Sequence, residues 1–190
     1  LHGLLIRVSY GSLSGTAVKR DFVELPSQIM EHWAIEPTVL KQYARHHKTN
    51  KAIPTELINK ILATQTFNQG FATTEYLAAS YLDLKWHDQT VDDQISASEI
   101  ESKTTKDINL VPEIAPRYRS SYFQHIFSGG YSAGYYAYIW AEVLETDAYE
   151  EFKKNGIFDK KTAQSFRSNI LEKGGSEKPM TLYKNFVGRE

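Results

Sequence analysis

The sequence of 190 residues contains no cysteine. Disulfide frameworks, cysteine-ligated zinc or iron–sulfur sites and thiol nucleophiles are therefore excluded for this chain. A run of about 18 apolar residues is also missing, so no membrane-spanning helix and no membrane partner are expected. The start of the sequence lacks a basic segment followed by an apolar one. We therefore expect no signal peptide and a cytoplasmic location, with the periplasm as the alternative for a longer parent protein.

An excess of charge of either sign is missing too, because 22 Lys and Arg residues stand against 23 Asp and Glu residues. A general nucleic-acid binder needs a basic surface that displaces counterions from phosphates, so no nucleic-acid partner is expected. The hydrophobic fraction of 41% is ordinary for a globular chain, whereas the 12 tyrosines are numerous. Catalysis by this chain would have to use His, carboxylate, Tyr, Ser or Lys side chains.

Apolar residues recur at helical spacing along most of the chain, which predicts a mainly α fold. We expect helices, bounded by prolines, glycines and capping residues, at about 21–35, 38–47, 54–69, 71–87, 98–110, 133–154, 159–173 and 178–187. Residues 4–10 alternate enough to suggest at most a short β segment. No repeat or linker divides the sequence, so residues 1–190 are expected to form a single domain.

The predicted helix at 21–35 carries one polar stripe among hydrophobic residues. Glu24, Gln28 and Glu31 are spaced at i, i+4 and i+7, so they share a helix face. A carboxylate there can bind a metal or orient a ligand, although spacing alone favours a solvated stripe. The six histidines form no HExxH pair, in which two His one helical turn apart face one metal.

A second cluster is HIFSGGYSAGYYAYIW, which begins at His125. Its paired glycines, Gly129 and Gly130, permit positive φ and a close approach of backbone to a ligand. Imidazole and phenol donors next to them can stabilise a developing oxyanion. Tyr131, Tyr135 and Tyr138 share a face if the following helix starts early enough. An aromatic helix packed in a core, with the glycines in an ordinary turn, is an equally good interpretation.

Several long stretches resemble the zinc oligopeptidase family that includes thimet oligopeptidase and neurolysin, and within it most of all the bacterial peptidyl-dipeptidases (dipeptidyl carboxypeptidases). The stretches are LHGLLIRVSYGSLSGT, RDFVELPSQIMEHWA, LDLKWH and PRYRSSYFQHIFSGGYSAGYYAYIWAEVL, together with the terminal helices. They span essentially the whole chain in order. The resemblance implies that residues 1–190 are a single incomplete domain, the helical C-terminal part of a zincin-like metallopeptidase catalytic domain.

The resemblance also implies roles for residues in the first stripe. In that family an HEFGHxLH helix supplies two zinc-binding His and a general-base Glu, and a Glu in a context like FVELPSQ completes the metal site. That Glu matches Glu24, and Glu31 would be at most a carboxylate behind the ligands. The sequence begins at LHG, after the position of the zinc motif, so we expect zinc in the intact enzyme and no peptidase activity from this chain alone.

The Gly/Tyr segment matches the substrate-binding loop of the family. The resemblance implies that His125 and Tyr131, with Gly129 and Gly130, contact the peptide, and that Tyr138 donates its hydroxyl to the oxyanion. Tyr135 is a weaker candidate in the same cleft. Arg117 or Arg119 would either recognise the substrate's C-terminal carboxylate or form structural ion pairs.

Three functions remain open at this point. The first is the C-terminal part of an enzyme that releases dipeptides from the C-termini of short peptides, with the missing N-terminal part of the same enzyme as its partner. The second is a non-catalytic helical module that binds peptides or proteins. The third is one chain of a split enzyme. We also expect self-association, because apolar surface left uncovered is rarely tolerated on a monomer.

Overall fold

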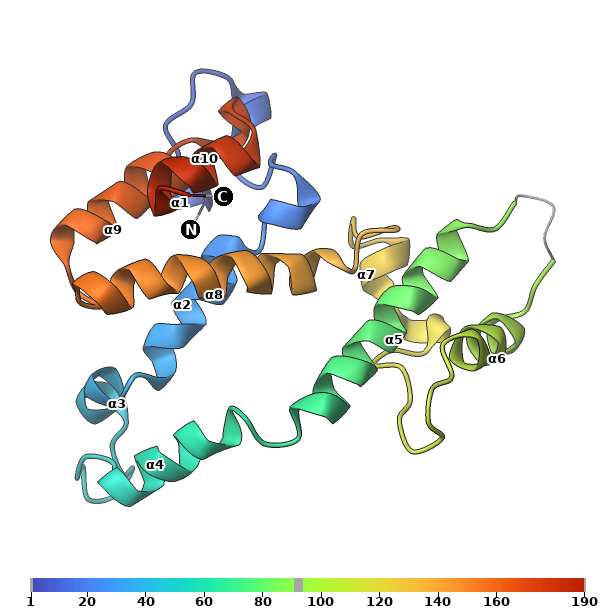
Figure 1. The fold of residues 1–190 in the computed structure, drawn as a ribbon, viewed down its shortest axis with the longest axis horizontal. Helices are drawn as coiled ribbons and strands as arrows, with labels where there is room; N and C mark the ends of the chain where they lie inside the picture. The colour runs from blue at the N-terminus through green and yellow to red at the C-terminus, as the bar shows by residue number, and fades with distance from the viewer. Residues whose placement is uncertain (1, 91–93, 190) are drawn as a thin grey trace. The chain divides into compact units, whose positions relative to one another are not determined.

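The structure is a computed structural model that describes residues 2–90 and 94–189, and helices account for most of it (Figure 1). The α-helices are α1 (His2–Leu5), α2 (Leu25–Ile35), α3 (Pro37–Tyr43), α4 (Thr55–Thr64), α5 (Gln69–His87), α6 (Ala97–Asp107), α7 (Gln124–Phe127), α8 (Ala137–Asn155), α9 (Lys160–Phe166) and α10 (Pro179–Val187). Short 3₁₀ turns are η1 (Gly11–Leu13), η2 (Arg20–Phe22), η3 (Ser120–Tyr122) and η5 (Gly174–Ser176), and η4 (Arg167–Leu171) is a π-helical turn. The predicted mainly α fold is confirmed.

The suggested β segment at residues 4–10 is not formed. Leu4 and Leu5 belong to α1, and the only pairing of β type in the described ranges is one isolated bridge between Arg45 and Ala52. The backbone N–H of Arg7 instead donates to the carbonyl of Glu172 over 2.8 Å. The segment is therefore fastened to the C-terminal region without a strand partner.

The chain divides into two compact units. Unit 1 comprises Leu1–Leu62 and Ala137–Glu190, and unit 2 comprises Ala63–Tyr136. Unit 1 is thus built from two separate stretches of sequence, and unit 2 is one continuous stretch between them. No composition shift marks either boundary, and a single domain over residues 1–190 stays a prediction.

Unit 1 is organised around one apolar core. The core joins η2, α2, α8, α9, η4 and α10 through Phe22, Leu25, Ile29, Leu144, Ala148, Tyr149, Phe152, Phe166, Ile170, Leu171, Leu182, Tyr183 and Val187. Figure 1 shows α2 crossing α8, and the two helices are in contact. Burial of such side chains provides most of the driving force for folding, at about 25 cal/mol per Å² of apolar surface.

Two glycines let the N-terminal segment of unit 1 approach its C-terminal helices. A Cβ at Gly174 would lie 2.4 Å from both the Cδ1 of Ile6 and the carbonyl oxygen of Leu13. A Cβ at Gly175 would lie 2.2 Å from the carbonyl oxygen of Ala17. Because these distances are far below van der Waals contact, only glycine fits at both positions.

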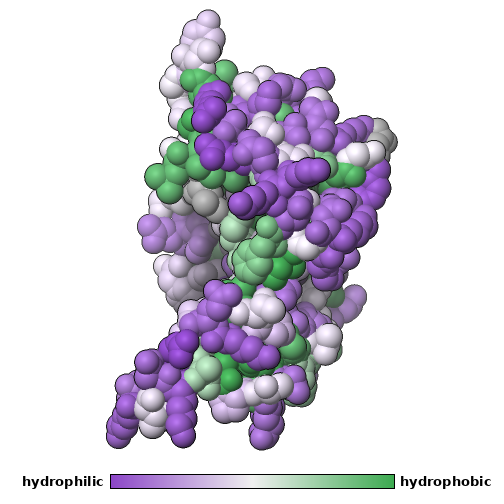
Figure 2. All heavy atoms as spheres, turned by 90° about the vertical axis from the view of Figure 1, so that its left-hand side faces the viewer, coloured by the Kyte–Doolittle hydropathy of each residue, from purple (hydrophilic) through white to green (hydrophobic). Residues whose placement is uncertain are grey.

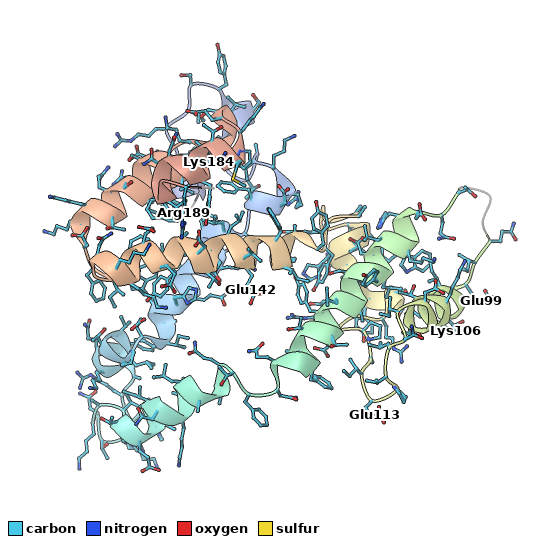
Figure 3. The ribbon with its side chains drawn as sticks, in the orientation of Figure 1. Glu99, Lys106, Glu113, Glu142, Lys184 and Arg189 are labelled. Carbon is cyan, nitrogen blue, oxygen red and sulfur yellow. The ribbon has the colours of Figure 1, made fainter. Side chains whose placement is uncertain are left out.

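Unit 2 contains α5, α6, η3 and α7. Its α6 begins with a capping box, in which the Ser96 hydroxyl accepts from the Glu99 N–H and the Glu99 carboxylate accepts from the Ser96 N–H. The Ser96 hydrogen bonds lower the pKa of Glu99, which is labelled at this end of α6 in Figure 3. Buried residues of α5, α6 and α7 form the centre of the unit, including Ala79, Leu82, Ile100 and Ile126.

The surface mixes charged and apolar residues. Figure 2 shows hydrophobic residues emerging among hydrophilic ones on the face it presents. Large apolar side chains are exposed in unit 1 at Leu57, Val143 and Phe158, and in unit 2 at Phe67. Among the helices of the described part of the chain, none has the length and apolar character needed to cross a bilayer.

Candidate functional site

Glu24 lies where η2 meets α2, at the N-cap position of that helix. Its neighbours Phe22 and Leu25 are both buried in the core of unit 1, so the backbone at Glu24 is anchored on both sides. Its half-buried side chain is held by the first turn of α2, because the Ser27 hydroxyl lies 2.7 Å from Glu24 Oε2. The same hydroxyl lies 2.9 Å from the Glu24 carbonyl oxygen, and its single proton can serve one of the two at a time. Glu24 therefore presents an oriented carboxylate.

Gln28 connects the helix of Glu24 to the helix of Tyr138. The Gln28 Nε2 donates to the carbonyl oxygen of Tyr138 over 3.1 Å, while the Gln28 Oε1 is buried and has no hydrogen-bond partner among the residues that the structure describes. Tyr138 is the second residue of α8 and is half-buried. The first turns of α2 and α8 thus lie side by side in unit 1. Glu31, one turn beyond Gln28, is exposed, so the three polar residues of the predicted stripe have different surroundings.

The rings of His125 and Tyr131 lie close together in unit 2. His125 belongs to α7, and its ring centroid lies 6.2 Å from that of Tyr131 and 5.2 Å from that of Tyr118. The N–H of Tyr131 donates to the His125 carbonyl over 3.0 Å. The chain therefore folds back on α7 directly after the glycine pair.

The glycine pair makes this reversal possible. A Cβ at Gly129 would lie 2.7 Å from the Cα of His125, so a side chain would collide with the backbone of α7. Gly130 has φ of 81°, in the left-handed region that glycine enters without steric cost. Both glycines are exposed, which leaves the backbone of this turn accessible.

Tyr135 is a core residue of unit 2. It is only 3% exposed, its ring stacks on Tyr76 at 5.2 Å, and its edge contacts Phe123 at 4.8 Å. Burial raises the pKa of the Tyr135 phenol to about 12, so it stays protonated at neutral pH. Its surroundings are those of a packed aromatic cluster.

The three tyrosines do not share a helix face. Ala133 has φ of 51°, a left-handed conformation that a helix cannot include, and α8 begins only at Ala137. Tyr131 and Tyr135 therefore precede the helix and belong to unit 2, whereas Tyr138 belongs to unit 1. The expectation of a helix from residue 133 is corrected accordingly.

Asp83 of α5 is a residue that the sequence reasoning missed. Its side chain is fully buried, and its carboxylate accepts the N–H groups of Ala133 (2.9 Å) and Tyr135 (2.8 Å). The Nδ1 of His87, one helical turn later, lies 2.9 Å from Asp83 Oδ1. The available signal was a carboxylate and an imidazole four residues apart in LDLKWH.

The two arginines differ in their contacts. Arg119 forms an ion pair with Glu101 of α6 at 2.8 Å, and Glu101 also accepts the Ser120 N–H at 2.7 Å. Burial raises the pKa of Glu101, but the hydrogen bonds from Ser120 and Arg119 outweigh it, and the net shift is downward. Arg117 lies over the Tyr76 ring, 5.7 Å from its centroid. Arg119 thus has the structural ion pair that was one of its two interpretations.

The residues that the structure describes do not form a complete zinc site. Within 2–90 and 94–189, no group of three or more His, Asp or Glu residues is placed to hold a metal ion. A catalytic zinc normally takes three protein ligands and a water. Glu24, with Ser27 hydrogen-bonded to its carboxylate, fits one ligand of such a set, because ligating carboxylates are usually oriented by a hydrogen bond.

Comparison with known proteins covers the whole chain. Residues 1–190 match the model of Peptidase family M3. The chain is 44% identical over 192 residues to the dipeptidyl carboxypeptidase of Escherichia coli K12, a match covering 100% of this chain and 28% of that protein. It is 41% identical to oligopeptidase A of Salmonella typhimurium, of which it covers 28%, and 35% identical to the organellar oligopeptidase A of Arabidopsis thaliana, of which it covers 25%. The chain therefore spans about a quarter of the length of these relatives.

Proposed function

Because the chain belongs to peptidase family M3, we propose that it forms the C-terminal part of the catalytic region of a zinc peptidyl-dipeptidase. The observation that carries this proposal is the pairing in unit 1, where Gln28 joins the helix of Glu24 to the start of the helix of Tyr138. A candidate metal ligand and a candidate oxyanion donor thus occupy the first turns of two packed helices. The identity to a dipeptidyl carboxypeptidase supports the release of C-terminal dipeptides from short peptides.

In this proposal Glu24 supplies one ligand of the zinc site, and its carboxylate is oriented by Ser27. The two His ligands and the general-base Glu come from an HExxH segment outside this chain. A zinc held there would supply Lewis-acid chemistry, polarising the scissile carbonyl and lowering the pKa of the attacking water. Since one carboxylate does not retain a catalytic zinc, we propose that residues 1–190 alone are inactive. Glu31 is exposed and contributes at most to the surroundings of the ligands.

The remaining residues act on the peptide itself. The Tyr138 hydroxyl donates a hydrogen bond to the oxyanion that forms at the scissile carbonyl, where donors are worth most because the charge develops in the transition state. His125 and Tyr131 contact the peptide beside the accessible backbone of Gly129 and Gly130. The burial of Tyr135 favours a role in packing beneath this loop.

The test joins this chain to the HExxH-bearing segment of a relative, such as the dipeptidyl carboxypeptidase of Escherichia coli. Zinc content and the release of dipeptides from short peptides are measured with and without a chelator. We expect no hydrolysis by residues 1–190 and chelator-sensitive hydrolysis by the joined protein.

A matched pair of variants sharpens this test. Glu24→Gln is expected to reduce both zinc retention and kcat/KM by more than about 100-fold, since even residues behind the ligands are worth 10- to 100-fold. Glu56→Gln makes the same change in charge at an exposed pair with Lys60 in α4 and is expected to change neither. Full zinc retention by Glu24→Gln would refute the assignment of Glu24.

A helical module that binds peptides or proteins without cleaving them is the second candidate. It is favoured by the exposed apolar side chains of both units. We also propose that residues 1–190 self-associate through such side chains. Sedimentation of the isolated chain tests this, and a monomer at all concentrations contradicts it. Hydrolysis by the joined protein would exclude a purely binding function.

A further inference from the structure

Asp83 is an unusual residue in the interior of unit 2. It has no exposed surface, and it lies on α5 between the buried Ala79 and Leu82 on one side and the half-buried Trp86 on the other. Burying a carboxylate is costly unless hydrogen bonds replace the water it loses. A helix that needed only an apolar contact here would be served better by leucine. The Asp83 carboxylate is therefore expected to accept hydrogen bonds that an apolar side chain could not accept.

That partner is the loop between α7 and α8. Asp83 Oδ1 accepts the N–H of Ala133 at 2.9 Å, and Asp83 Oδ2 accepts the N–H of Tyr135 at 2.8 Å. Both donors are backbone groups some fifty residues away in sequence. One carboxylate thus holds two alternate residues of the loop at once, and this fixes the path of the backbone as well as its distance from α5.

His87 completes the arrangement. Its Nδ1 lies 2.9 Å from Asp83 Oδ1 and 2.8 Å from the Asp83 carbonyl oxygen, and both of these atoms can only accept. The Nδ1 must therefore carry a proton to bond with them. The Ala133 N–H, 3.3 Å from the same nitrogen, then has the carboxylate as its acceptor. His87 adds a third donor to the buried charge and leaves the loop amides bound to Asp83.

The loop needs this support because its conformation is not favoured locally. Ala133 has φ of 51°, which is unfavourable for a residue with a Cβ, and Gly130 at 81° is the other left-handed residue of the segment. Gly129, Gly130 and Tyr131 lie directly before the two amides that Asp83 binds. Movement at Ala133 would therefore move Tyr131 relative to His125.

We propose that Asp83, supported by His87, is a positioning residue that holds the loop 129–136 in the shape that binds the peptide substrate. The inference rests on the proposed function for the role of this loop. Asp83 itself contacts no substrate. It acts through the Ala133 and Tyr135 amides, and its removal should loosen the loop without changing zinc retention.

Unit 2 offers a matched control. Glu101 is also a carboxylate of low exposure, and it also accepts a backbone N–H, that of Ser120, at 2.7 Å. Its bond lies between α6 and η3, outside the loop 129–136. Asp83→Asn and Glu101→Gln thus make equivalent chemical changes at two backbone tethers of one unit.

The experiment uses the protein joined to its HExxH-bearing segment and combines amide hydrogen exchange with kinetics. In Asp83→Asn, one amide loses its acceptor and faces an NH₂ group, so exchange at Ala133 and Tyr135 should accelerate about 10- to 100-fold. The value of kcat/KM should fall by about 10-fold or more, with zinc content unchanged. In Glu101→Gln, exchange should accelerate at Ser120, with kcat/KM within about 2-fold of wild type.

His87→Gln provides the second variant in case Asp83→Asn does not fold. It retains the carboxylate, so exchange at Ala133 should accelerate less, by about 2- to 10-fold. Unchanged exchange at Ala133 and Tyr135 in a folded variant would overturn the inference, as would accelerated exchange with wild-type kcat/KM. A wild-type joined protein without hydrolysis would instead overturn the proposed function, and the exchange rates would still decide whether Asp83 holds the loop.

Discussion

Units 1 and 2 hold their candidate site residues by different physical means. In unit 1, Glu24 and Tyr138 stand at the starts of helices that are fixed by an apolar core running from Phe22 to Val187. In unit 2, the loop with Gly129 and Tyr131 is held by the buried Asp83 carboxylate, by hydrogen bonds back to α7 and by a cluster of aromatic rings. Apolar packing is spread over many small contacts, whereas a buried polar tether concentrates its effect in a few directional bonds. We therefore expect the loss of one side chain to affect the stability of unit 1 as a whole, whereas loss of the carboxylate in unit 2 should affect mainly the loop.

The largest effect is expected from a cavity in the core of unit 1. Phe166→Ala removes a ring that is 2% exposed and contacts Phe152 and Phe186, so the free energy of unfolding should fall by about 3–5 kcal/mol. Denaturant unfolding measures this loss. Phe158→Ala, at a position 63% exposed, should cost less than about 1 kcal/mol. Equal losses in the two variants would contradict the assigned core.

The next largest effect is expected on kcat, from a substitution that leaves side-chain packing unchanged. Tyr138→Phe removes one hydroxyl and keeps the ring, so kcat of the joined protein should fall by about 10²- to 10³-fold with little change in KM or thermal stability. Tyr81→Phe, which removes the hydroxyl of a half-exposed tyrosine of α5, is the control and should leave kcat unchanged. A Tyr138→Phe variant with a raised KM and an unchanged kcat would assign this hydroxyl to ground-state binding instead.

A smaller effect is expected from the hydroxyl beside the candidate ligand. Ser27→Ala removes the donor to Glu24 Oε2 and should weaken zinc binding by about 10- to 100-fold. Competition with a metal-binding dye measures the affinity. Ser168→Ala removes a hydroxyl that donates to carbonyl groups of α9, and it should leave the zinc affinity as it is. Identical affinities in all three proteins would show that Ser27 serves only the helix start.

The smallest expected effect is a pH-dependent contribution of Glu101, in unit 2, to the free energy of unfolding. The folded-state pKa of Glu101 lies below its ordinary value, so its contribution to stability is complete above about pH 4.3, the value for an unfolded Glu, and is lost as pH falls through the lower folded value. Glu101→Gln should therefore be less stable than wild type by about 1.5 kcal/mol at pH 7, and the difference should vanish in acid. Unfolding curves between pH 2 and 7 test this. A difference that is constant with pH would refute it.

Local signals in the sequence predicted most helices well. Proline and capping residues explain the agreement, as at α9, where the Asp159 carboxylate accepts the Thr162 N–H at 2.7 Å. The start of α8 could not be found this way. It is delayed by Ala133, whose left-handed conformation is held by a carboxylate fifty residues earlier, and alanine carries no turn signal.

The same distinction applies to the candidate site, where local sequence pointed to the residues but not to the contacts that hold them. The candidate residues themselves were proposed from segments that resemble a known family. Gln28 was noted only as part of a polar stripe, and Asp83 was missed, because both side chains bond to elements that periodicity cannot bring together. The two compact units also leave no mark in the sequence. Unit 1 is discontinuous in sequence, so its boundaries fall inside ordinary helical sequence.

The discontinuity of unit 1 has a consequence during synthesis on the ribosome. All residues of unit 2 are available once Tyr136 has left the exit tunnel, whereas the core that contains Phe22 and Leu25 still lacks α8, α9 and α10. At about 5–20 residues per second, these early apolar side chains wait several seconds for their partners. The nascent chain should therefore pass through a state in which the residues of unit 2 can fold while the core of unit 1 is still incomplete. That state is where we expect chaperones to bind.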